Sequence, residues 1–251
     1  MSCVDIRGCR IGEGRPKVIL PIVERAEAAI LEKAAQFSTL QADCVEWRVD
    51  YFEGARAPGA VARCLAKMRV ILRDKLLLVT FRTKAESGEQ ALSHPEYLAF
   101  LRLILDTDCA DLLDIEFFTA GADLPNLVEQ AHSAGVAVVC SSHDFTKTPP
   151  RAELVCRMVQ MQQAGADLPK VAVMPQSRTD VLELLAATAE MADLHPETPV
   201  ITMSMGALGA VSRLAGESFG SAMTFANPGQ ASAPGQVSLD IVNEVLDALH
   251  L

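Results

Sequence analysis

The chain has 251 residues, half of them hydrophobic, with 22 basic and 32 acidic side chains and a formal net charge of -10. This acidic balance argues against nucleic acid or an anionic membrane as the main partner, although local arginines still allow a small anionic substrate. No apolar run has the length of a membrane span, and the N-terminus lacks a signal-peptide core, so we expect a cytoplasmic protein.

The seven cysteines are scattered along the chain and odd in number. They form no CxxC pair, and the chain contains no HExxH motif. Cysteines placed in apolar patterns are typical of reduced, buried side chains in a cytoplasmic protein. The sequence therefore predicts no metal site.

Short runs typical of β-strands alternate with longer amphipathic stretches along the chain. The predicted strands are 17–22, 44–50, 76–82, 112–118, 136–143, 168–174, 200–204 and 222–225. The predicted helices are 25–40, 60–73, 95–105, 123–134, 151–163, 179–192, 208–214 and 239–249. Repeated βα pairs at intervals of about 30 residues predict an α/β fold, a (β/α)8 TIM barrel, formed by residues 1–251 as a single domain.

The main alternative fold is a doubly wound sheet, which usually has a glycine-rich phosphate loop after its first strand. Here that position reads Ile22-Val23-Glu24-Arg25 and has no glycine. The segment 3–14, before the first strand, has alternating character and a Gly-Cys-Arg centre. We expect it to form a β-hairpin that closes the bottom of the barrel.

Charged residues alternate with apolar ones in several predicted strands, which places the charges in the barrel lumen. Charges there need partners or ligands. For Asp50, Asp114 and Glu116, an internal ion-pair network and substrate contact are both open. For Arg48 and Arg82 we favour ligand contact, because they lie near the C-terminal ends of their strands, where barrel enzymes have their active sites.

Lys170 lies within the apolar run 167–175, which reads as a buried strand. Lysine is rarely buried unless it is paired or functional, and burial favours its neutral, nucleophilic form. Such an amine forms Schiff bases with ketones and aldehydes. The alternative is a lysine at a strand end that extends to water. Lys170 is also near the start of its strand, so its amine would have to act deep in the lumen.

Other polar residues follow the C-terminal ends of later strands. His143, with an expected pKa near 6.5, suits proton transfer, and Glu86 could orient its imidazole. Arg213 suits a carboxylate. Ser232 and Gln236, in a loop after the last strand, suit hydroxyl groups, while Met203 and Met205 suit an apolar wall. Each also has an ordinary structural alternative. His143 would be a structural histidine, and Glu86 and Arg213 would be surface residues. Ser232 and Gln236 would be ordinary polar loop residues, and the two methionines would fill the core.

Several segments together resemble the type I 3-dehydroquinate dehydratases. The resemblance extends from Gly12 to Gln236 and is specific because the segments occur in this order on repeated βα units. Its segments are Glu46-Trp47-Arg48-Val49-Asp50, Thr80-Phe81-Arg82, Ser142-His143-Asp144-Phe145, Pro169-Lys170-Val171-Ala172, Met203-Ser204-Met205-Gly206, Ser212-Arg213 and Ser232-Ala233-Pro234-Gly235-Gln236.

The resemblance implies a barrel enzyme that converts 3-dehydroquinate to 3-dehydroshikimate in the shikimate or quinate pathway, without a metal or organic cofactor. It implies that Lys170 forms an imine with the C3 ketone, that His143 is the acid and base, and that Glu86 orients His143. Arg213 would hold the ring carboxylate. The resemblance further implies hydroxyl-binding or site-shaping roles for Glu46, Arg48, Arg82, Ser232 and Gln236, and apolar walls formed by Met203, Met205, Phe145 and Phe225.

One position departs from the resemblance: Pro21 ends the first strand where some relatives have a serine, which removes any contact from a hydroxyl there. Two other functions stay open. One is a further Schiff-base lyase such as a class I aldolase, and the other is a non-catalytic domain that senses quinate or shikimate metabolites. Since members of the family are often dimeric, we expect a homodimer.

Overall fold

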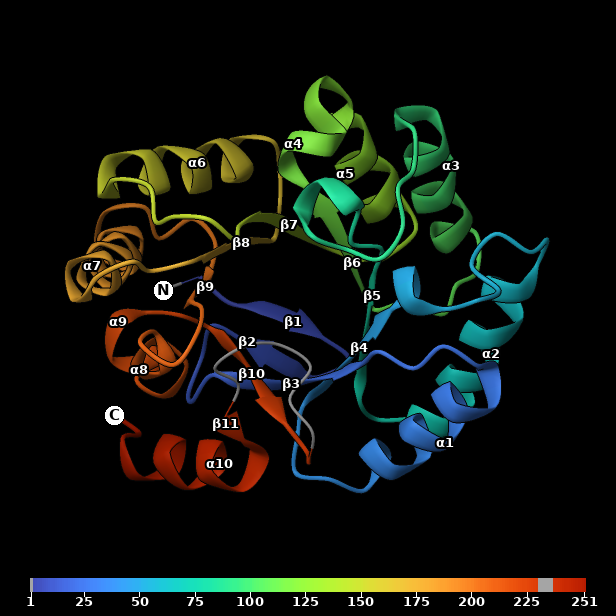
Figure 1. Cartoon of the computed structure of the whole chain (residues 1–251), viewed down its shortest axis with the longest axis horizontal. Helices are drawn as coiled ribbons and strands as arrows, with labels where there is room; N and C mark the ends of the chain where they lie inside the picture. The colour runs from blue at the N-terminus through green and yellow to red at the C-terminus, as the bar shows by residue number, and fades with distance from the viewer. Residues whose placement is uncertain (1, 230–236) are drawn as a thin grey trace.

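The computed structural model describes residues 2–229 and 237–251, and parallel strands form a ring at its centre (Figure 1). The ring strands are β3 (Lys17–Ile22), β4 (Cys44–Arg48), β5 (Leu76–Thr80), β6 (Leu112–Glu116), β7 (Ala137–Asp144), β8 (Leu168–Val173), β9 (Ile201–Ser204) and β10 (Met223–Asn227). They pair in chain order, and β10 pairs with β3. A parallel bridge between Val200 and Ser221 joins the two ends of the sheet. The short β11 (Val237–Ser238) pairs with β10.

Helices surround this ring (Figure 1). The helices that follow the ring strands are α1 (Glu27–Ser38), α2 (Ala60–Leu72), α3 (His94–Leu105), α5 (Leu124–Ser133), α6 (Arg151–Gln163), α7 (Arg178–Leu194), α8 (Ala210–Leu214) and α10 (Leu239–Ala248). Shorter helices are α4 (Phe117–Ala120) and α9 (Gly216–Phe219), and 3-10 turns are η1 (Val49–Tyr51), η2 (Lys84–Glu86) and η3 (Gly121–Asp123). This arrangement confirms the predicted α/β barrel. The assignment of residues 1–251 to a single domain stays a prediction.

Local sequence explains where individual helices begin. At the start of α3, Ser93 and Glu96 form a capping box, which satisfies backbone N–H groups that have no partner within the helix. Pro95 lies in the first turn, where its missing N–H does no harm. At the start of α7, the Ser177 hydroxyl accepts a hydrogen bond from the Asp180 backbone N–H at 3.2 Å. These capping interactions define where α3 and α7, the helices after β5 and β8, begin.

Three predicted strands, 44–50, 76–82 and 112–118, extend two residues too far, and side-chain contacts explain the first and the last. The strand predicted to end at Asp50 ends at Arg48, and η1 follows it. There the Asp50 carboxylate accepts the Arg82 backbone N–H at 3.3 Å and the Glu89 backbone N–H at 3.1 Å. The strand predicted to end at 118 ends at Glu116, where the Thr119 hydroxyl donates to the Glu116 carboxylate at 2.6 Å. Polar side chains therefore turn the chain where apolar periodicity alone predicts a longer strand.

Apolar side chains fill both the shell outside the ring and the bottom of its lumen. Val45, Trp47 and Val49 are fully buried in the cluster between the sheet and the helices. Inside, Ile19, Cys44, Leu76, Leu112, Val139, Leu168 and Ile201 form a separate buried cluster. The alternation predicted from the sequence of β4 is therefore confirmed: its apolar set faces the helices, and Glu46 is left to the lumen.

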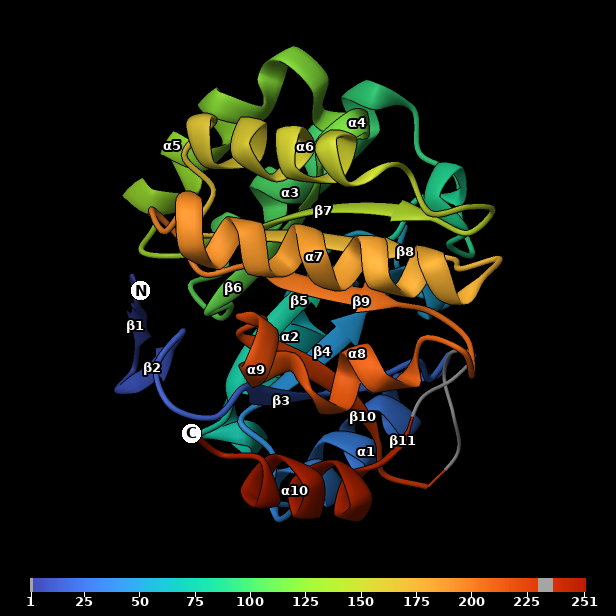
Figure 2. The same cartoon turned by 90° about the vertical axis from the view of Figure 1, so that its left-hand side faces the viewer.

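The hairpin of β1 (Val4–Ile6) and β2 (Cys9–Ile11) closes the bottom of this lumen, as predicted. Ile11 is fully buried in the lumen cluster, and Val4, Ile6 and Cys9 pack against that cluster. Figure 2 shows the hairpin at the end of the molecule opposite the arrowhead of β7. The C-terminal ends of the strands are thus the open end of the barrel.

Among the described helices, none combines the length and the hydropathy that crossing a membrane would require.

Substitution of Ile11 by alanine tests this closure. Because Ile11 fills the bottom of the lumen, Ile11→Ala should leave a cavity and lower the free energy of unfolding by about 2–5 kcal/mol. Urea unfolding measures this change. The matched control is Ile241→Ala on α10, where the side chain is 49% exposed, and a change below about 0.5 kcal/mol is expected. An equally small change for both variants would contradict a sealing role for the hairpin.

Candidate active site

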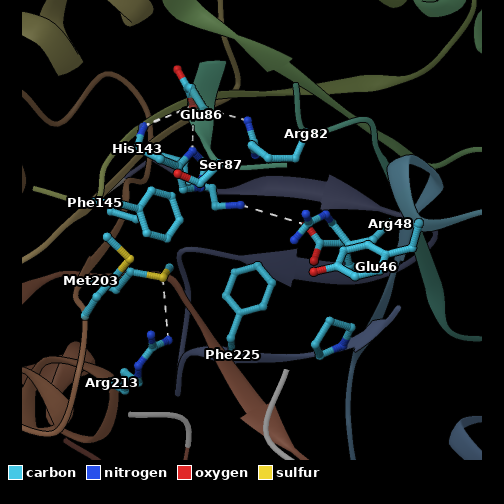
Figure 3. Close-up of a pocket in the computed structure, with 15 residues that line it drawn as sticks. Glu46, Arg48, Arg82, Glu86, Ser87, His143, Phe145, Met203, Arg213 and Phe225 are labelled. Carbon is cyan, nitrogen blue, oxygen red and sulfur yellow. Dashed lines mark hydrogen bonds and ion pairs between the residues drawn. The ribbon is translucent and has the colours of Figure 1, made fainter. Parts of the chain in front are cut away.

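A pocket opens at the C-terminal ends of the strands, and the side chains proposed from the sequence surround it (Figure 3). Its lining contains Lys170, His143, Glu86, Glu46, Arg48, Arg82, Arg213, Met203, Met205, Phe145 and Phe225. The two remaining candidates, Ser232 and Gln236, lie outside the described residues. Pro21, Tyr51, Ser87 and Ala172 also line the pocket. The residues named from strand alternation, from their positions after strands and from the family resemblance therefore come from different elements and meet at one opening.

Lys170 lies deep in the lumen, as its early position in the strand suggested. It is the third residue of β8 and only 3% exposed, so it does not extend to bulk water. Its Nζ atom lies 3.5 Å from an Asp114 carboxylate oxygen and 4.0 Å from a Glu46 carboxylate oxygen. The same nitrogen lies 4.8 Å from the centre of the Phe225 ring. The amine is thus held between two carboxylates and an aromatic face, with the pocket beside it.

Arg82 is the centre of a buried charge cluster. Its NH1 atom donates to Glu116 and Ser141 at 3.0 Å each and to Glu86 at 3.3 Å, and its NH2 atom donates to Asp114 at 2.9 Å. Burial lowers the pKa of Arg82, but the neighbouring carboxylates outweigh burial and raise it overall. The ion-pair network left open for Asp114 and Glu116 therefore exists, and Arg82, expected mainly to contact a ligand, belongs to it.

His143 is fixed by Glu86 on one side of the pocket (Figure 3). One Glu86 oxygen, Oε2, lies 2.8 Å from His143 Nδ1 and accepts the His143 backbone N–H at 3.1 Å. Because Oε2 also accepts from Arg82, the geometry favours Nδ1 as a third donor, which leaves the lone pair on Nε2. The imidazole can then accept a proton through Nε2.

Burial shifts both members of this pair toward their neutral forms. It lowers the pKa of His143 well below the ordinary value, and the positive charges of Arg82, Lys170 and Arg48 lower it further. Burial raises the pKa of Glu86 to about 8, although Arg82 opposes the change. The expectation of a histidine pKa near 6.5 is therefore wrong for this structure, because that value describes a solvated imidazole.

The position of Glu86 depends on a tight loop after β5. The Thr83 hydroxyl and backbone N–H both bind Glu116, at 2.7 and 2.8 Å, and anchor the start of η2. At Gly88 the backbone passes close to that of Arg82. A Cβ atom added to Gly88 would lie 1.9 Å from the Arg82 carbonyl oxygen. Only glycine fits there. The loop thereby brings Glu86 back over the pocket.

Arg213 lies on the opposite side of the pocket from His143 and Glu86 (Figure 3). It is 3% exposed, and its NH1 atom lies 3.6 Å from the sulfur of Met203. Its Nε atom has no hydrogen-bond partner within the described part of the chain. Burial lowers the pKa of Arg213 to about 10, so it is charged near neutral pH. A buried cation without a carboxylate neighbour at this wall is suited to an anionic group of a ligand.

Aromatic and apolar side chains complete the walls. Phe145 stacks beside the His143 ring, with 6.2 Å between ring centres and 16° between planes. Tyr51 also lines the pocket, and the sequence interpretation missed it. The centre of its ring lies 5.0 Å from the Arg48 guanidinium carbon. Alternation could not identify Tyr51, because η1 replaces the predicted end of the strand. Pro21 lines the pocket with a side chain that has no hydroxyl group.

Within residues 2–229 and 237–251, no group of three or more histidine, cysteine or acidic side chains is arranged to hold a metal ion. The titratable side chains that line the pocket include an amine, an imidazole, the carboxyl groups of Glu46 and Glu86, and the guanidinium groups of Arg48, Arg82 and Arg213. An amine beside a carbonyl, with an imidazole within the same pocket, is suited to imine formation followed by proton transfer.

Comparison with known proteins identifies relatives over nearly the whole chain. A family model described as Type I 3-dehydroquinase matches residues 18–251. The 3-dehydroquinate dehydratase of Bacillus licheniformis is 46% identical over 247 residues, which cover 98% of this chain and 97% of the relative. The 3-dehydroquinate dehydratase of Bacillus subtilis is 46% identical over 250 residues, which cover 100% of this chain and 98% of the relative.

A solved structure gives the same result for the fold. The type I 3-dehydroquinate dehydratase from Clostridium difficile superposes with a TM-score of 0.96 at 43% identity, and the match covers 99% of this chain and 98% of that chain. Both the sequence and the fold are matched over nearly their whole length. We conclude that this chain belongs to the type I 3-dehydroquinase family.

Proposed function

We propose that this protein removes water from 3-dehydroquinate to give 3-dehydroshikimate, with Lys170 as the amine that forms an imine with the substrate. The observation that carries the proposal is a buried lysine whose amine faces a pocket shared with His143 and Arg213. Full-length relatives with the name 3-dehydroquinate dehydratase support the reaction. The cyclic substrate has a C3 ketone for the amine and a carboxylate for the arginine.

The reaction begins with addition of the Lys170 nitrogen to the C3 carbonyl. The resulting carbinolamine loses water, and a protonated imine forms. This cation withdraws electrons from the neighbouring C2–H bond and makes it acidic. Asp114 and Glu46, at 3.5 and 4.0 Å from the amine, then stabilise positive charge at the imine nitrogen. The depth of Lys170 in β8 requires the ring to enter the lumen.

His143 then transfers the protons. Its neutral imidazole removes the C2 proton through Nε2, which gives an enamine. The enamine expels the C1 hydroxyl, and the same proton returns to that oxygen, so water leaves. Hydrolysis of the product imine restores the free amine. Glu86 is a positioning residue in this scheme, because it binds Nδ1 and fixes the direction of Nε2.

The remaining side chains bind and orient the substrate. Arg213 pairs with the ring carboxylate at the wall opposite His143, while Arg48, Arg82 and Glu46 bind hydroxyl groups or shape the site. The apolar walls exclude water from the charged intermediates. The hydroxyl-binding roles expected for Ser232 and Gln236 stay predictions, because both lie outside the described residues.

The two alternative functions are less well supported. A class I aldolase usually has a phosphate site after the last strands, and Arg213 is the cation that lines the pocket from that region among the described residues. A non-catalytic metabolite sensor does not need Lys170 and His143, yet both line the pocket. Our proposal also includes the cytoplasmic location, the homodimer and the absence of a metal or organic cofactor, which rest on the sequence and on family resemblance.

Replacement of Lys170 tests the proposed function. Lys170→Ala removes the only group that we assign to imine formation, so turnover should fall by roughly four to six orders of magnitude. The absorbance of the conjugated enone product measures turnover. The matched control is Lys75→Ala at the bottom of the barrel, where Nζ donates to two backbone carbonyl groups. Wild-type turnover in Lys170→Ala, or none in the wild-type protein, would refute the proposal.

The lowered pKa of His143 predicts a particular pH profile. A base acts when neutral, and the pKa lies well below the ordinary value of about 6.5, so kcat/KM should not decline until the pH is below that value. The measurement is kcat/KM against pH for the wild type and for Glu86→Gln, which removes the titration expected near pH 8. An acid limb centred at or above about pH 6.5 would show that His143 is not the neutral base.

A further inference from the structure

A fully buried carboxylate, Asp50, holds the Arg48 side chain in one orientation. The Arg48 Nε atom donates to Asp50 Oδ1 and the Arg48 NH2 atom to Asp50 Oδ2, both at 2.8 Å. This two-point contact fixes the plane of the guanidinium group as well as its position. Asp50 is 0% exposed and is absent from the pocket lining, whereas Arg48 lines the pocket.

The orientation leaves one nitrogen of Arg48 for a ligand. Asp50 occupies Nε and NH2, and the Tyr51 ring packs against the guanidinium group at 5.0 Å. Within residues 2–229 and 237–251, no hydrogen bond from Arg48 NH1 to another residue is present. Figure 3 shows Arg48 beside Glu46, across the pocket from Met203. The NH1 group of Arg48 therefore lies at the pocket wall, where it can donate to a substrate hydroxyl group.

The same carboxylate also binds the segment that carries Glu86. Its Oδ1 atom accepts the Arg82 backbone N–H at 3.3 Å, and its Oδ2 atom accepts the Glu89 backbone N–H at 3.1 Å. The Asp50 carbonyl oxygen accepts from Gln90 Nε2 at 2.7 Å. These contacts lie on either side of Glu86 in the chain. Asp50 thus connects the wall with Arg48 to the loop that positions His143.

We propose that Asp50 is a positioning residue for substrate binding: it directs Arg48 NH1 toward a substrate hydroxyl and holds the loop 82–90 in place. The inference rests on the proposed function but is distinct from it, since Asp50 touches neither the substrate nor the reacting atoms. Loss of the Asp50 charge would leave the Arg48 guanidinium group without its charged hydrogen-bond partner. Such a loss typically weakens the interaction by about tenfold or more.

The test is a double-mutant cycle of Asp50→Asn with Arg48→Ala, with KM and kcat measured for 3-dehydroquinate. Asparagine keeps the shape of the side chain but loses the charge and one acceptor oxygen. In the wild-type background, Asp50→Asn should raise KM about tenfold. In the Arg48→Ala background, the same substitution should leave KM unchanged, because its effect passes through Arg48. A loss in kcat should occur in both backgrounds, because Asp50→Asn removes an acceptor for the backbone N–H groups of the loop 82–90 whether or not Arg48 is present.

The matched control is Asp111→Asn, which also changes a buried aspartate that binds an arginine, Arg69, and a backbone N–H group, that of Leu77. Because Asp111 is absent from the pocket lining, KM of the Asp111→Asn variant should equal the wild-type value. Its unfolding temperature should fall, because the substitution weakens a buried ion pair. A KM for Asp50→Asn equal to that of the wild type, or a KM rise of the same factor in both backgrounds, would overturn the inference.

Two further results keep the test decisive. Arg48→Lys retains a charge beside Asp50 but has no second nitrogen to direct into the pocket, so its KM should rise as in Arg48→Ala. A wild-type KM for Arg48→Lys would overturn the inference even if Asp50→Asn failed to fold. Absence of turnover in the wild-type protein would refute the proposed function first, and this inference with it.

Discussion

The site depends on the ion-pair cluster around Arg82 in the barrel lumen. An isolated charge in such a place would be several kcal/mol unfavourable, so each one needs partners. Arg82 binds Asp114, Glu116 and Glu86, which come from β6 and from the loop after β5. Asp114 in turn lies next to the Lys170 amine. One arginine therefore joins the carboxylate beside the nucleophile to the carboxylate that holds His143.

This cluster explains how polar chemistry takes place in a protein interior. The bottom of the lumen is apolar and covered by the hairpin, whereas the pocket opens at the C-terminal ends of the strands. Above that layer, the charges of Arg82, Glu116 and Asp114 satisfy one another. Arg213 differs, because it is buried without a carboxylate partner among the described residues. The site thus combines a pre-organised interior with one cation that a substrate carboxylate can neutralise.

The period-two pattern makes much of this predictable. Because alternate side chains of a strand share a face, the order of residues in β4 is enough to assign Glu46 and Arg48 to the lumen. The βα repeat predicts the ring, and the order of short motifs predicts the family. The depth of Lys170 also follows from its place in the run 168–174.

Other features depend on contacts between distant segments, which no local pattern contains. At the early end of β4, Asp50 accepts from Arg82 and Glu89, and at the early end of β6, Glu116 accepts from Arg82 and Thr83. Tyr51 reaches the pocket only because η1 turns the chain. The pKa of His143 depends on its burial and on charges from other strands, so an isolated imidazole predicts the wrong value. The role of Arg82 in the ion-pair cluster also depends on distant segments, because Asp114 and Glu116 are 32 and 34 residues away in the chain.

The central claim is that the buried amine of Lys170 forms a covalent imine with the substrate ketone. Borohydride reduction in the presence of 3-dehydroquinate, followed by peptide mass spectrometry, tests it most directly. We predict a stable adduct on the peptide that contains Lys170, and no adduct on the peptide that contains Lys75 or in the Lys170→Ala variant. Substrate turnover without any reducible adduct, or an adduct on a different lysine, would contradict the account.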